Sequence, residues 1–170
     1  MDGLRLDLRG RLVVPGFIDI HTHGGHGVTF GMMETLEEDL RDSAYLALQH
    51  LMQGFYDYGP NNLGTENLRE VYQNGLYLLY RLLFILYGES RGLLPMDNVQ
   101  YQLFGFDDLR RKIIAQLDRG TPIPKRGDKY YNQLQSLFRL INGADAAFNA
   151  EVKVVRYNGG LFDPEQHPFL

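Results

Sequence analysis

Two histidines that lie two positions apart carry the clearest metal-binding chemistry of the chain. His21 and His23 follow the stretch FIDI at residues 17–20, which predicts a short β-strand. Side chains two apart on a strand face the same side, so both imidazoles can reach one divalent ion. Two histidines alone hold a metal weakly and provide no positioned base for its bound water. The alternative is a glycine-rich loop with solvated imidazoles.

A second candidate site is the D-x5-E-x-K pattern formed by Asp145, Glu151 and Lys153. Two carboxylates and a lysine at such a spacing resemble metal-dependent nucleases, in which they bind Mg²⁺ and activate water. The pattern is short and frequent by chance, and no Pro-Asp dipeptide precedes it. We therefore assign it no catalytic role.

A third candidate is a basic cluster that we interpret as a phosphate-contacting patch for nucleic acid. The predicted DNA-binding residues are Arg110, Arg111, Lys112, Lys125, Arg126 and Lys129. Arg119 lies among them, and locally these cations outnumber Asp118 and Asp128. The alternative interpretation is an ordinary solvated helix face followed by a loop.

The elements that position these residues are mostly helices. Apolar residues recur every three or four positions from about residue 34 to the Gly59-Pro60 pair, which predicts a first amphipathic helix. The same periodicity predicts helices at about residues 66–90, 107–117 and 129–141. The second half of the 66–90 helix is apolar nearly all round, so we expect it to be central to the fold.

Charged residues at the end of that central helix invite two interpretations. Glu89 and Arg91 follow its most apolar stretch, and Arg81 interrupts the stretch itself. They either form ion pairs across a domain junction or simply mark the charged end of a helix at the edge of the core.

In the last part of the chain the spacing of apolar residues changes from a helical to an alternating pattern. Val152, Val154 and Val155 predict a strand, and Asn158 with the two glycines after it predicts a tight turn into a returning strand. The apolar end of the chain, which lacks a polar tail, leads us to expect a truncated protein.

These patterns predict a mainly α fold of about four helices, with an irregular N-terminal extension and a short C-terminal β-hairpin. We divide the chain into an extension at residues 1–33, a helical domain at residues 34–146, and a β segment at residues 147–170 that leads to a missing catalytic domain.

The region from about residue 35 to residue 170 resembles the central helical region of type IIG restriction–modification enzymes and of related phage-exclusion adenine methyltransferases. The resemblance rests on three blocks in the family's order: residues 80–95 (YRLLFILYGESRGLLP), residues 134–143 (LQSLFRLING) and residues 157–162 (YNGGLF). It implies a non-catalytic scaffold or connector of an adenine-specific DNA methyltransferase, with S-adenosylmethionine as the parent enzyme's cofactor and DNA as its partner.

Residues 11–30 resemble a different family. The stretch VPGFIDIHTHGG at residues 14–25 is similar to the first barrel strand of metal-dependent amidohydrolases, closest to N-acetylglucosamine-6-phosphate deacetylases. That resemblance implies a divalent metal bound by His21 and His23. Because neither family contains the motif of the other, the chain looks chimeric.

The sequence lacks features that amidohydrolase catalysis and adenine methylation each require. An amidohydrolase needs a barrel of about 250 residues, and no alternation of strands and helices follows residue 31. Adenine methylation needs an Asn/Asp-Pro-Pro-Tyr/Phe motif to hold the flipped base, and the sequence has no Pro-Pro pair. We therefore expect an inactive fragment. A generic helical interaction module is the remaining alternative.

Composition narrows the remaining classes. The 170 residues are 44% hydrophobic and 22% charged, as in a globular protein with a real core. The net charge of −4 argues against strong autonomous DNA binding. The absence of cysteine excludes disulfides and thiolate metal sites and is compatible with the cytoplasm. We expect no membrane span, and self-association through exposed apolar surface is plausible.

Overall fold

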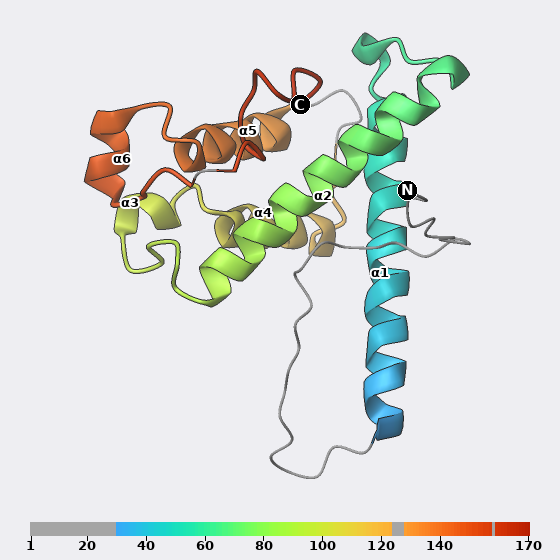
Figure 1. Cartoon of the computed structure of the whole chain (residues 1–170), viewed down its shortest axis with the longest axis horizontal. Helices are drawn as coiled ribbons and strands as arrows, with labels where there is room; N and C mark the ends of the chain where they lie inside the picture. Colours follow the sequence, from blue (N-terminus) through green and yellow to red (C-terminus); the bar gives the residue numbers. More distant parts are fainter. Residues whose placement is uncertain (1–29, 124–127, 158) are drawn as a thin grey trace, which may run out of the picture. The chain divides into compact units, whose positions relative to one another are not determined.

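The computed structural model describes residues 30–123, 128–157 and 159–170, with side chains from residue 38 onward. This part of the chain is all-helical (Figure 1). Its α-helices are α1 (Phe30–Asp57), α2 (Leu68–Ser90), α3 (Val99–Gln102), α4 (Phe106–Asp118), α5 (Lys129–Ile141) and α6 (Ala146–Val152). Two 3-10 turns, Gly59–Asn61 and Thr65–Asn67, connect α1 to α2.

The chain divides into two compact units within α1. The first covers residues 1–47, of which the structure describes only the first part of α1, and the second covers residues 48–170. In the first unit Leu40 and Leu46 are about half exposed, at 49% and 55%. The domain boundaries predicted at residues 33 and 146 remain predictions.

The predicted mainly α class is confirmed. The four predicted helices correspond to α1, α2, α4 and α5, and the bounds of α5 agree with the expected ones. The two short helices, α3 and α6, were not predicted. Each is capped at its start by a side chain, because Asn98 and Asp145 accept hydrogen bonds from the first free N–H groups.

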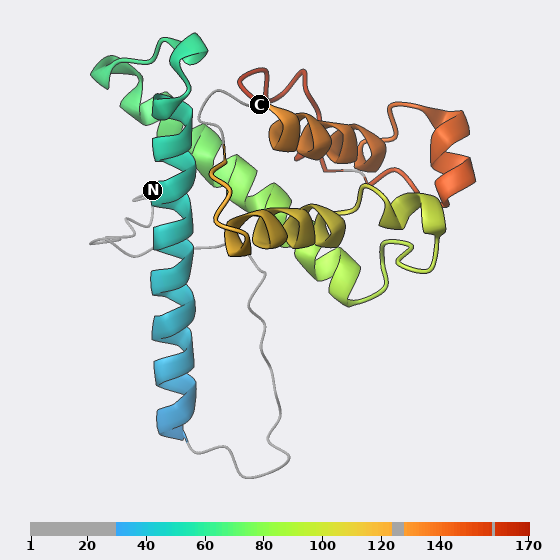
Figure 2. The same ribbon diagram turned by 180° about the vertical axis from the view of Figure 1, so that it is seen from behind.

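The core of the second unit forms around α2, as its apolar sequence predicts. Figures 1 and 2 show α4 and α5 lying near α2, and α3 and α6 beside each other. The buried apolar cluster draws residues from α2, α3, α5, α6 and the segments that follow α2 and α6. Its members are Leu78, Ile85, Leu94, Tyr101, Leu137, Phe138, Leu140, Ile141, Val152, Val154 and Phe162.

The end of α1 packs closely on α2 at a glycine. A Cβ at Gly75 would lie only 3.1 Å from Cδ1 of Leu48 and 3.3 Å from Cγ of Met52. The absence of a side chain there lets the two helices approach each other. Asn61 secures the connection, because its Nδ2 donates to the Phe55 carbonyl over 2.9 Å.

The predicted C-terminal β-hairpin is wrong for the residues described. Val152 is the last residue of α6, and the N–H of Val154 donates to Asn149 O over 2.9 Å. The N–H of Tyr157 donates to Ile141 O at the end of α5. Val152 and Val154 are buried and Val155 is exposed, so the burial of side chains does alternate along this segment. The hydrogen-bond partners, however, are helix ends and not a second strand. Asn158 lies outside the described residues.

We predict that Lys153→Gly stabilises the protein. Lys153 ends α6 with φ 61° and ψ 35°, a left-handed conformation that costs a residue with a Cβ about 1 kcal/mol and costs glycine little. The free energy of unfolding in urea should rise by about that amount. Lys112→Gly, the same change inside α4, should lower it by about 1 kcal/mol, because glycine is a poor helix former. Loss of stability in Lys153→Gly would contradict the backbone assignment.

Candidate functional site

Several predicted site residues cannot be compared with the structure. His21 and His23 lie outside the described residues, and so do Lys125 and Arg126. Among the described residues, no group of three or more His, Asp or Glu side chains is arranged to hold a metal ion. The metal-site hypothesis for His21 and His23 therefore remains a prediction.

The basic residues of α4 are paired with acidic residues of the same helix. Arg110 lies 2.8 Å and Arg111 3.0 Å from the Asp107 carboxylate, and Lys112 contacts Asp108 at 2.5 Å. These pairs are three or four residues apart, the spacing that brings side chains together on a helix surface. The pKa of Asp107 is lowered, chiefly by its hydrogen bond from Arg110. Because Asp107, Asp108 and Asp118 offset these three cations, α4 has no net charge.

Two further members of the basic cluster are engaged locally. Arg119 donates through Nε to the Ala115 carbonyl over 2.8 Å, and Lys129 lies 5.8 Å from the ring centre of Tyr130. Arg110, Arg111 and Lys112 of the predicted phosphate patch are therefore exposed, but their charge is neutralised within α4.

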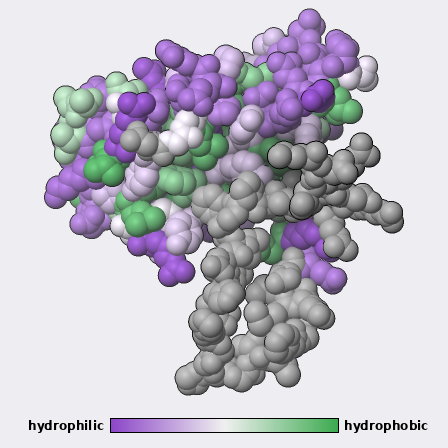
Figure 3. All heavy atoms as spheres, viewed as in Figure 1, coloured by the Kyte–Doolittle hydropathy of each residue, from purple (hydrophilic) through white to green (hydrophobic). Residues whose placement is uncertain are grey.

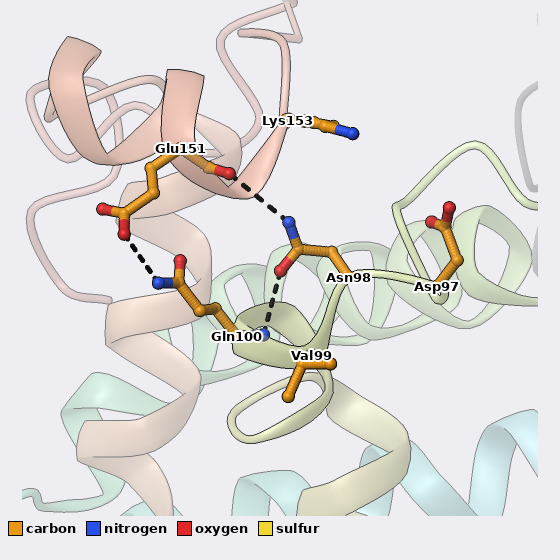
Figure 4. A pocket seen from close by; sticks show the side chains of 6 residues that line it. All are labelled: Asp97, Asn98, Val99, Gln100, Glu151 and Lys153. Carbon is orange, nitrogen blue, oxygen red and sulfur yellow. Dashed lines mark hydrogen bonds between the residues drawn. The ribbon is translucent and has the colours of Figure 1, made fainter.

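The D-x5-E-x-K residues do not form one site. Asp145 caps the start of α6 through hydrogen bonds from the N–H groups of Ala147 and Phe148. Glu151, one residue before the end of α6, accepts a 2.6 Å hydrogen bond from Gln100. Figure 4 shows Lys153 pointing away from the Glu151 carboxylate at the rim of a shallow pocket. The pattern belongs to the capping and packing of α6.

The most unusual polar group in the described part of the chain is Arg81 of α2. Its side chain is buried, with the residue 2% exposed, and among the described residues no carboxylate lies within ion-pair distance of it. Nε donates a 2.7 Å hydrogen bond to the Leu161 carbonyl, while Nη2 has no partner. Burial lowers the pKa of Arg81, although a guanidinium keeps its charge in proteins.

Two aromatic rings take the place of a counter-ion. The guanidinium carbon lies 4.9 Å from the ring centre of Phe138 and 5.8 Å from that of Phe162. Phe138 and Phe162 also contact each other, with their centres 5.7 Å apart. The negative face of an aromatic ring attracts a cation, and the attraction grows when water is excluded. Arg81 is therefore held by π faces and one carbonyl.

This arrangement brings three distant chain segments together. Arg81 belongs to residues 80–95, Phe138 to residues 134–143, and Phe162 to residues 157–162. The same segments meet again at Tyr157, whose hydroxyl donates to Leu93 O over 2.8 Å and whose N–H donates to Ile141 O over 3.1 Å. We call the meeting point of Arg81, Phe138, Leu161 and Phe162 the Arg81 junction.

Glu89 organises a second junction, one that does not include Arg81. Its carboxylate accepts hydrogen bonds from the N–H of Phe106 at 2.7 Å, the N–H of Asp107 at 3.0 Å and the Tyr101 hydroxyl at 2.9 Å. The negative charge of Glu89 also interacts favourably with the positive, N-terminal end of the α4 helix dipole. Burial raises the pKa of Tyr101, and the neighbouring Glu89 raises it further. Arg91 instead lies over the Tyr87 ring, at 5.6 Å.

The segment at residues 159–170, which we call the tail, lies against α2 and α5. Tyr131 and Gln135 of α5 both donate to the main-chain oxygen of Leu170, over 3.1 and 3.2 Å. His167 lies on Tyr77 of α2, with ring centres 4.2 Å apart. A shallow pocket of about 530 Å³ borders this contact, lined by side chains of α2 and the tail.

The sequence contained a signal for Arg81 but none for its partners. An arginine within an apolar helix is conspicuous, since a charge is rarely buried without reason. Its acceptor is a main-chain carbonyl 80 residues away, which carries no mark in the sequence.

No known protein family, curated protein or solved structure matches this chain. In the part of the chain that the structure describes, no helix is long and apolar enough to span a membrane.

We predict that acid loosens the tail through His167. Burial lowers the pKa of His167, the nearby Arg81 lowers it further, and a hydrogen bond with Gly160 and the charge of Asp163 oppose these effects. A lowered folded pKa means that the unfolded chain binds the proton more readily. The stability from neutral His167 is therefore complete above the unfolded pKa of about 6.5 and is lost as the pH falls below it.

The measurement is the free energy of unfolding between pH 7.5 and 5. His167→Gln should reduce its decline toward acid. His50→Gln, which changes an exposed histidine of α1, is the matched control and should leave the decline in place. An equal effect of both substitutions would contradict the role of His167.

Proposed function

We propose that the chain is a non-catalytic helical scaffold of a restriction–modification type, adenine-specific DNA methyltransferase. Its role is to connect and brace the catalytic and DNA-recognition parts of that enzyme. The observation that supports this proposal is the Arg81 junction. Residues from all three sequence blocks that carry the resemblance meet there, although Leu161 lies 80 residues from Arg81.

The use of the polar groups favours a structural role over a catalytic one. Arg81 and Tyr157 donate to main-chain oxygens, and Glu89 accepts from the first turn of α4. Groups of this kind fix the chain in place and present no reactive atom to a substrate. In the parent enzyme, S-adenosylmethionine would donate its methyl group to adenine N6 in another domain, since the sequence has no Pro-Pro motif for the flipped base.

The charge distribution favours weak contact with DNA. Phosphate contacts supply most non-specific affinity, and on α4 each predicted contact residue already has a carboxylate partner. Transfer of these cations to phosphates would break pairs that the helix forms. We therefore expect DNA to be held mainly by other parts of the parent enzyme.

Two other functions are retained as alternatives. A metal-dependent hydrolase fragment that uses His21 and His23 would bind a stoichiometric divalent metal. A generic helical interaction module is favoured by exposed apolar side chains such as Leu83, Leu103 and Leu117. Figure 3 shows such residues lying among polar ones on one face of the molecule.

The decisive experiment for the parent enzyme is to read the encoding DNA beyond codon 170. A frame that continues into a glycine-rich strand–loop and an Asn-Pro-Pro-Tyr motif would support the proposal. An immediate stop codon, or a continuation without these motifs, would contradict it and leave the interaction module.

DNA binding by the chain gives an independent prediction. Anisotropy of a labelled duplex should reveal weak binding that falls about tenfold between 50 and 200 mM salt, as expected for about two phosphate contacts. The double variant Arg110→Ala/Arg111→Ala should weaken it more than Arg41→Ala/Arg69→Ala, which removes the same charge from exposed arginines elsewhere. Equal losses would remove α4 from the interface. Tight binding at 200 mM salt would contradict the scaffold proposal.

A further inference from the structure

We draw no further inference here: the strongest candidate, the exposed apolar patch that Ile114 and Leu117 form on the C-terminal half of α4, carries no proposal because nothing in the structure shows what covers it.

Discussion

The burial of Arg81, which has no acidic partner in the part of the chain that the structure describes, is the constraint on which the rest of the second unit depends. Removing a guanidinium from water costs several kcal/mol, and in this junction no carboxylate offsets that cost. The offset comes from the Leu161 carbonyl and from the faces of Phe138 and Phe162. Each of these groups must stay in place, since displacement of any one would leave a buried charge less compensated. The arginine thus couples α2, α5 and the tail.

α2 positions its neighbours through two charged residues of opposite sign. Arg81 holds the tail, and Glu89, about two turns later, holds the start of α4. In both cases the partner atoms belong to the main chain: the Leu161 carbonyl in the tail, and the first two N–H groups of α4. The apolar surface of α2 supplies the burial, and these two residues determine where the connected segments lie. Such an organisation suits a piece whose proposed role is to hold other parts of an enzyme in position.

Helical periodicity predicted the long elements because it is a local property of the sequence. α1, α2, α4 and α5 could be predicted from their apolar spacing, and the ion pairs of α4 follow from acidic and basic residues three and four apart. The short helices were missed because their signal is a single capping side chain. Asp145 was considered as a metal ligand, and in the structure it caps α6. Residues 152–155 were interpreted as a strand because their valines alternate, but a strand needs a partner strand that the sequence pattern cannot identify.

The central claim is that Arg81 holds the tail, and hydrogen exchange of the tail amides tests it most directly. The N–H groups of Asp163, His167 and Leu170 are hydrogen-bonded within the tail and report on its order. In Arg81→Lys and in Arg81→Met, we predict that their protection falls about tenfold or more, because the part-buried Leu161 carbonyl loses its donor. Protection within the hairpin formed by the end of α1 and the start of α2 should change much less. Unchanged protection of the tail, or an equal loss throughout the second unit, would contradict the account.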